Sequence, residues 1–312
     1  MLISKAMKKF LLYIFIFFGI VAVVDYGFGL SCEWLQANAK SGVERGIYQF
    51  AKVQTSDIIV MGSSRAHHSY VPRVINEITG MSAYNGGVDG NGIVLSNGLR
   101  YLIYERYEPE IILYDITPGF DYTTNEMDEN NVRYCGYLRP YFFNKKIREV
   151  LCCVDNRERY KNFSAMFRYN SCIIELLKDQ FVFDSHIKDG YEPLGSVINN
   201  ERLENGNTGK SNMLMGDDSP IDQLKMNTIE NFISDVRDSD TRLVFIASPR
   251  LGAVSSELFN PIKEVCSRYN IEFWDYYCDS AFQNPEYYAD QVHLNDKGAN
   301  AFSRCIAHRL ID

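Results

Sequence analysis

Five short apolar runs are the feature that most constrains the fold of this chain of 312 residues. The runs lie at 57–61, 81–84, 110–114, 242–247 and 271–277. Stretches with helical spacing of apolar residues separate them, as between 93 and 106. Apolar runs that alternate with helices predict a parallel sheet covered by helices on both faces. We therefore expect an α/β fold, a three-layer sandwich around a five-stranded parallel sheet.

The alternation breaks between residues 121 and 220. This stretch holds an acidic, amide-rich loop, polar helical pieces and a tract rich in glycine and asparagine. Sites in parallel sheets gather at the carboxyl ends of the strands. We expect 121–220 to be an insertion over that edge, within a single domain that spans 55–312.

The N-terminus has the pattern of a membrane segment. Lys5, Lys8 and Lys9 precede an uncharged run over 10–24, which reaches the roughly 17 to 25 residues of a membrane span if counted on through Leu30. Asp25 interrupts it. A cleavable signal peptide is the alternative, although no A-x-A-like cleavage site follows.

The favoured interpretation of the N-terminus is an uncleaved membrane anchor over 1–32. Its basic end would lie inside the cell and the bulk of the chain would be exported. A polar connector at 33–54 would then lead to the domain.

Charge and cysteine spacing exclude other classes. The net charge is −8, whereas binding to nucleic acid needs a basic face, so we expect no nucleic acid partner. The eight cysteines form no C-x-x-C pair and no ligand-like spacing with histidine. We therefore expect no zinc site. No other metal and no cofactor are expected either.

Two polar turns carry the main candidate chemistry. Gly-Ser-Ser-Arg at 62–65 follows the first strand, where a sharp strand-to-helix turn would expose the Ser64 hydroxyl. Asp-Gln-Val-His at 290–293 precedes the last helix, and Asp290 would hold one nitrogen of His293 while the other nitrogen faces the serine. Such a histidine takes the serine proton and returns it to the leaving group. Each turn also has an ordinary interpretation, as a plain turn or a capping turn with a surface histidine.

A third turn, Asn-Gly-Gly at 85–87, ends the second strand. The backbone N–H of Gly87 would face an oxyanion beside the N–H of Ser64, and donors of this kind contribute about 3 to 4 kcal/mol each. Asn85, Arg65 and Asp115 are candidates for supporting roles. For Arg65, contact with an anionic substrate and a structural ion pair both remain open.

Other polar residues near these turns have weaker claims. His67 and His68 lie three and four positions after Ser64, where reaching back to the serine as a base is difficult. His186 and His308 have no partners in the sequence and are expected at the surface. The run over 189–193 would either line the substrate cleft or form a turn with a packed tyrosine.

In these motifs the chain resembles the SGNH/GDSL hydrolase superfamily, over 55–117 and 240–310. The Gly-Asp-Ser block of that family matches 62–64 and puts Ser64 in the place of the nucleophile. Its glycine block matches Gly87, and its D-x-x-H block matches Asp290 and His293. The resemblance implies a flavodoxin-like fold and an esterase or acyltransferase activity. The family's Gly-x-Asn-Asp block is missing, because Tyr-Asp-Ile-Thr-Pro stands at 114–118 instead.

The aspartate of the first block is also replaced, by Ser63. Both departures, together with the N-terminal segment, resemble the membrane-anchored branch that acts in extracytoplasmic acyl transfer. That branch includes D-alanyl transfer proteins of teichoic-acid modification and alginate acetylation proteins. The resemblance implies an acylated cell-surface glycan as substrate and a multi-pass membrane acyltransferase as a candidate partner. The alternative is a non-catalytic binding or assembly subunit with the same fold, which the missing block favours.

Overall fold

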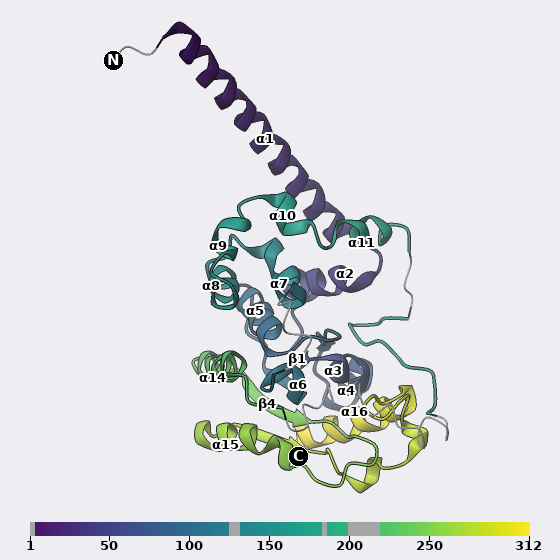
Figure 1. Cartoon of the computed structure of the whole chain (residues 1–312). Helices are drawn as coiled ribbons and strands as arrows, with labels where there is room; N and C mark the ends of the chain where they lie inside the picture. The colour runs from purple at the N-terminus through teal and green to yellow at the C-terminus, as the bar shows by residue number, and fades with distance from the viewer. Residues whose placement is uncertain (1–3, 125–131, 183–185, 199–218) are drawn as a thin grey trace. The chain divides into compact units, whose positions relative to one another are not determined.

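The computed structural model describes residues 4–124, 132–182, 186–198 and 219–312 (Figure 1). The chain divides into two compact units. One unit consists of Met1–Arg45 and Gly136–Phe183, and the other of Gly46–Cys135 and Asp184–Asp312. This division differs from the expected single domain with an insertion at 121–220, because 136–183 groups with the N-terminal helix.

The larger unit contains the predicted five-stranded parallel sheet. Its strands run in the order β2-β1-β3-β4-β5, and every neighbouring pair is parallel. This is one of the common orders of doubly wound α/β folds. All residues of β1 and β3 are buried, as expected for strands covered on both faces. The strands are β1 (Ile58–Gly62), β2 (Ala83–Asn85), β3 (Ile111–Asp115), β4 (Arg242–Ala247) and β5 (Glu272–Asp275).

Helices form the two outer layers. The chain moves outward from β1 to β2 and then crosses back to β3, so right-handed crossovers place α4 and α5 on opposite faces. α16 packs against α4 on one face, and α14 packs against α5 on the other (Figure 1). The bounds are α4 (Pro72–Thr79), α5 (Ile93–Tyr104), α14 (Gln223–Arg237), α15 (Asn260–Tyr269) and α16 (Asp296–Ile311).

The remaining helices are short, and some of them lie in the segment 33–54 that was predicted as a polar connector. The stretch 33–54 is mostly helical: it holds the end of α1 (Lys5–Asn38), then α2 (Gly42–Tyr48), then a π-helix at Gln49–Val53. The short α-helices are α2 (Gly42–Tyr48), α3 (Ser64–Ser69), α6 (Pro118–Asp121), α7 (Val132–Leu138), α8 (Lys145–Val154), α9 (Glu158–Lys161), α10 (Ala165–Tyr169) and α11 (Ile173–Lys178).

The helix α1 (Lys5–Asn38) dominates the smaller unit and has two different halves. Its first part, up to Val24, is exposed, and the helix is long and apolar enough to cross a membrane. Its second part packs against α10 and α11 and buries Cys32 and Gln36. The helix thus continues six residues beyond the predicted boundary at 32, because its second half has a protein core to pack against.

Asp25 lies where the two halves of α1 meet and binds the start of α10. Its carboxylate accepts hydrogen bonds from the Ser164 hydroxyl at 2.6 Å, the Ala165 amide at 2.7 Å and the Met166 amide at 3.0 Å. The first amides of a helix have no partner within the helix, so an anion at this point satisfies them. This contact explains an acid at the end of an otherwise apolar run.

Replacing Asp25 with alanine is expected to lower the free energy of unfolding of the full-length protein by about 1 to 3 kcal/mol. The loss arises because the amides that open α10 and the Ser164 hydroxyl lose their charged acceptor. Chemical unfolding in detergent micelles, followed by circular dichroism, measures it. Glu33→Ala is the matched control, since Glu33 is an exposed acid on the same helix. Equal stability of the two variants would contradict the capping role.

Candidate active site

The strand β1 ends in a turn that only glycine allows. Gly62 has a φ of 138°, and a Cβ atom at this position would lie 2.6 Å from the carbonyl oxygen of Asp115. Glycine tolerates this positive φ without the steric cost that other residues have. The chain can therefore turn from β1 directly into α3, whose first residue is Ser64. Ser63 is buried in the turn, with its Oγ 2.7 Å from Oγ1 of Thr117.

The turn brings Ser64 to His293, 229 residues away in the chain. Ser64 Oγ lies 2.8 Å from His293 Nε2, and His293 Nδ1 lies 2.8 Å from Asp290 Oδ2. The other carboxylate oxygen of Asp290 accepts the backbone amides of Val292 and His293 at 2.8 and 2.9 Å. The three side chains therefore form one hydrogen-bonded chain.

The partner of each atom sets the proton positions in this chain. An ionised carboxylate only accepts, so His293 Nδ1 carries a proton and Nε2 is left to accept the Ser64 hydroxyl proton. Burial disfavours the charged form of Asp290, but the hydrogen bonds from His293 and Val292 hold the pKa of this carboxyl below its usual value. This is the arrangement that a general base beside a serine nucleophile needs.

The backbone amide of Gly87 has a hydrogen-bond partner that the sequence did not predict. Its N–H donates to Asn85 Oδ1 at 3.0 Å, in the local turn that asparagine side chains form two residues ahead. It therefore has an acceptor already and is not free to bind an oxyanion. The absence of a side chain at Gly87 has another use, since a Cβ there would lie 2.4 Å from the His67 amide nitrogen. Glycine lets this loop approach α3.

Asn85 has a positioning role at the end of α3. Its buried Nδ2 donates to the carbonyl oxygens of Ala66 at 2.8 Å, Tyr70 at 2.9 Å and His67 at 3.3 Å. These bonds satisfy backbone groups that a helix end leaves without partners. Asn85 thus links the end of β2 to the helix that carries Ser64.

Arg65 is a buried structural residue and not a substrate contact. It is 1% exposed, and its guanidinium donates to the Ser248 hydroxyl and to the Ser248 carbonyl. Its Nε lies 3.9 Å from Oδ1 of Asp115. Asp115 is itself fully buried and accepts the Tyr70 hydroxyl at 2.7 Å. Burial raises the pKa of Asp115, while Arg65 acts in the opposite direction.

The residues that replace the missing Gly-x-Asn-Asp block are also internal. Asp115 is fully buried and Thr117 is 1% exposed. The Thr117 amide donates to Asp121 Oδ2 at 2.6 Å. Both residues therefore shape the loop after β3, and neither offers a donor at the surface beside Ser64.

The run at 189–193 is a turn with a packed tyrosine. Asp189 and Gly190 have φ values of 49° and 80°, and Lys188 and Tyr191 exchange both backbone hydrogen bonds around them. Two central residues with positive φ are typical of a type I′ hairpin turn. Tyr191 is buried and donates its hydroxyl to Asp296 at 3.0 Å.

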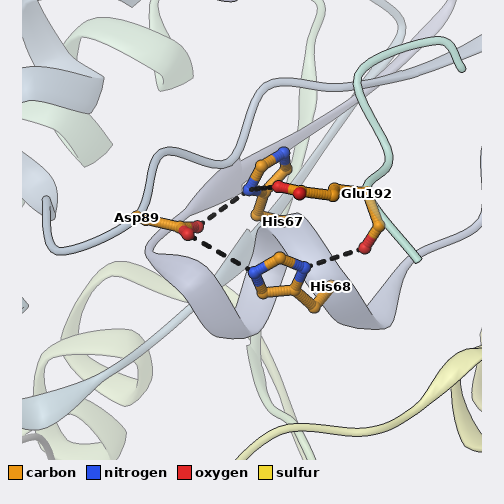
Figure 2. Close-up of side chains that lie close together, drawn as sticks. All are labelled: His67, His68, Asp89 and Glu192. Carbon is orange, nitrogen blue, oxygen red and sulfur yellow. Dashed lines mark hydrogen bonds and ion pairs between the residues drawn. The ribbon is translucent and has the colours of Figure 1, made fainter. Parts of the chain in front are cut away.

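The segment after this turn brings Glu192 to a cluster with His67, His68 and Asp89, which the sequence did not predict (Figure 2). His67 Nδ1 lies 2.8 Å from Asp89, and Glu192 approaches the same histidine at 3.8 Å. The adjacent His67–His68 pair was the only local signal, because the two acids come from distant parts of the sequence. The His68 ring lies edge-on to the His293 ring, with centroids 5.8 Å apart. The cluster is thus a neighbour of the candidate active site.

A separate hollow of about 780 Å³ lies in the larger unit. Its lining includes Arg73 on α4, Lys188 in the turn, and Lys297 and Arg304 on α16. Ser64, Asp290 and His293 are not part of that lining, so this hollow and the hydrogen-bonded serine are different places.

Comparisons with known proteins do not assign a function to this chain. Protein-family models give no match, and curated proteins give none. Among solved structures, a putative acylhydrolase from Bacteroides fragilis aligns at 11% identity with a TM-score of 0.38, over 86% of this chain and 97% of that one. A gut microbial diltiazem-metabolizing enzyme aligns at 12% identity with a TM-score of 0.36, over 81% of this chain and 45% of that one. Scores this low carry no argument about function.

Proposed function

We propose that this protein is a membrane-anchored, extracytoplasmic serine esterase or O-acyltransferase. Ser64 attacks an acyl carbonyl, His293 serves first as base and then as acid, and Asp290 orients the histidine. The N–H of Ser64 stabilises the oxyanion. The substrate is an acyl ester, most simply an acetyl ester, of a cell-surface glycan, as the resemblance to the anchored acyl-transfer branch implies.

The observation that carries this proposal is the hydrogen-bonded chain Ser64–His293–Asp290. One hydrogen bond of 2.8 Å links Ser64 to His293 from the opposite end of the domain, and a second of 2.8 Å links His293 to Asp290 in the same turn. The alternative interpretation, a helix-capping turn with a surface histidine, does not account for the Ser64 hydroxyl at Nε2 of His293. The order of the contacts, hydroxyl to Nε2 and carboxylate to Nδ1, is the one in which a serine becomes a nucleophile.

The packing of α1 supports an uncleaved anchor. The side chain of Asp25 binds the start of α10, and Cys32 and Gln36 are buried in the smaller unit. Removal of α1 as a signal peptide would take these residues out of that unit. The lysines before the apolar run favour a cytoplasmic N-terminus, and this orientation supports an extracytoplasmic location of the remaining chain.

A fluorophosphonate probe tests the serine chemistry directly. The full-length protein in detergent is expected to be labelled on Ser64, and Ser64→Ala or His293→Ala is expected to abolish labelling. Ser63→Ala is the matched control, because Ser63 is adjacent in the chain but bonded to Thr117. Absence of labelling in the wild type, or labelling that survives in Ser64→Ala, would contradict the proposal.

One observation favours a second function, a non-catalytic subunit that binds an acylated glycan for a multi-pass membrane acyltransferase. The Gly87 amide is bonded to Asn85, so the expected pair of oxyanion donors is not preorganised. A subunit of this kind would show no labelling, and its Ser64→Ala variant would retain full affinity for the acylated glycan. An enzyme gives the opposite result in the labelling experiment.

A further inference from the structure

Four side chains beside the candidate active site have the composition of a transition-metal site. His67 and His68 lie on α3, Asp89 lies in the loop after β2, and Glu192 follows the turn at 188–191 (Figure 2). One potential ligand atom from each residue can be chosen so that all four lie within 4.8 Å of one another. Three separate segments of the chain thus bring nitrogen and oxygen donors to one point.

Three of the separations between these side chains are near those of a tetrahedral metal site. His67 Nδ1 lies 2.8 Å from Asp89 Oδ1 and 3.8 Å from Glu192 Oε2, and His68 Nε2 lies 3.4 Å from Asp89 Oδ2. Donors placed about 2.0 to 2.1 Å from a tetrahedral Zn²⁺ are about 3.3 Å from one another. Small side-chain rotations would therefore bring the donors to bonding distance.

The orientation of His68 is an independent indication. Its Nδ1 lies 2.8 Å from the backbone carbonyl oxygen of Glu192. A carbonyl oxygen only accepts, so Nδ1 carries the proton, and in the neutral ring Nε2 presents its lone pair to Asp89. Histidines that bind metals commonly donate their other N–H to a carbonyl or carboxylate in this way. The 3.4 Å between Nε2 and Asp89 is also long for a direct hydrogen bond.

The charge and the donor types select the ion. Two carboxylates with two neutral imidazoles balance one divalent cation. Imidazole donors suit Zn²⁺ and related ions, whereas Ca²⁺ and Mg²⁺ prefer sites made of oxygen alone. A backbone hydrogen bond from the Glu192 amide to the His67 carbonyl, at 3.4 Å, already holds the third segment against α3.

We propose that His67, His68, Asp89 and Glu192 bind a Zn²⁺ ion that holds the 186–198 segment and the loop after β2 against α3. The ion sits beside the His68 ring, which packs edge-on against the His293 ring. It therefore stabilises one wall of the candidate active site and takes no part in the hydrogen bond between Ser64 and His293. This site is independent of the proposed serine chemistry, and either can fail without the other.

Metal titration of the full-length protein in detergent tests the site. The protein carries an affinity tag without histidine, is freed of metal with a chelator, and is titrated with ZnCl₂ by calorimetry. The wild type is expected to bind about one Zn²⁺ per chain. His67→Ala and Asp89→Asn are each expected to weaken binding by at least about tenfold, the lower end of what even outer-shell partners of a metal site cost. His308→Ala, which removes an exposed histidine from α16, is the matched control and is expected to bind like the wild type.

A second measurement keeps the test valid if a variant folds poorly. Co²⁺ bound to the wild type in a tetrahedral site gives strong visible absorption, and Zn²⁺ is expected to remove it by competition. Binding of Zn²⁺ well below one ion per chain in the wild type would overturn the proposal. So would equal Zn²⁺ affinity of the wild type and a folded Asp89→Asn variant.

Discussion

Replacing Ser64 with alanine is expected to lower kcat/KM for a small acetyl ester by roughly 10⁴-fold or more. The variant loses the attacking oxygen, and neither His293 nor the backbone amides can replace it. Asp290→Asn is expected to lower kcat by roughly 10³- to 10⁴-fold, because an amide in place of the carboxylate no longer holds the proton on His293 Nδ1. Hydrolysis of p-nitrophenyl acetate by the full-length protein in detergent measures both effects.

The split between kcat and KM separates catalysis from substrate positioning. Both variants are expected to change kcat with little change in KM, since Ser64 and Asp290 act in the transition state more than in substrate binding. Ser63→Ala serves as the control and is expected to retain activity within about tenfold, the usual cost of about one lost hydrogen bond. Retention of wild-type activity by Ser64→Ala would exclude Ser64 as the nucleophile.

Replacing Arg65 with methionine is expected to lower the free energy of unfolding by about 3 to 5 kcal/mol. The substitution leaves the Asp115 carboxylate, which is fully buried, without its only nearby cation among the described contacts. It also removes the guanidinium donors from the Ser248 hydroxyl and carbonyl. Urea unfolding of the full-length protein in detergent measures the loss.

The loss in Arg65→Met is expected to grow with pH. Burial raises the pKa of Asp115, and removal of Arg65, which lowers that pKa, raises it further. A carboxyl whose pKa is raised in the folded state contributes stability below its unfolded pKa and loses it as the pH rises through the folded pKa. The variant is therefore expected to be closest to the wild type in acid and furthest from it in alkaline solution.

A second substitution distinguishes charge from packing. Asp115→Asn combined with Arg65→Met removes both charges and is expected to recover part of the lost stability. The side-chain amide oxygen introduced at position 115 would still accept the Tyr70 hydroxyl, which bonds to Asp115 in the wild type. A double variant as unstable as the sum of both single variants would show that the pair does not interact.

The sheet could be predicted from the sequence because its signals are local. An apolar run such as 57–61 must be covered on both faces, and alternation with helices leaves few topologies. The same logic places Ser64 at the carboxyl end of a strand. It does not predict the bond from the Gly87 amide to Asn85, because the direction of one N–H depends on the conformation of the whole turn.

The two-unit organisation could not be predicted in the same way. The helices within 136–183 are short and polar on one side, so their sequences do not say which surface covers their apolar side. In the sequence Asp25 only interrupts the apolar run, whereas in the structure its carboxylate accepts backbone amides at the start of α10. The stretch 121–220 therefore looked like one insertion, whereas part of it belongs with α1.

The sequence by itself determined the parallel sheet, the turn at Gly62 and the choice of Ser64, Asp290 and His293 as a candidate site. Only the tertiary structure decided that Asp89 and Glu192 lie against His67 and His68, and that the Gly87 amide has a partner. The physical reason is the range of the interactions. Strands, turns and D-x-x-H spacing depend on neighbours in the chain. The histidine–carboxylate cluster depends on how segments that are far apart in the sequence pack together.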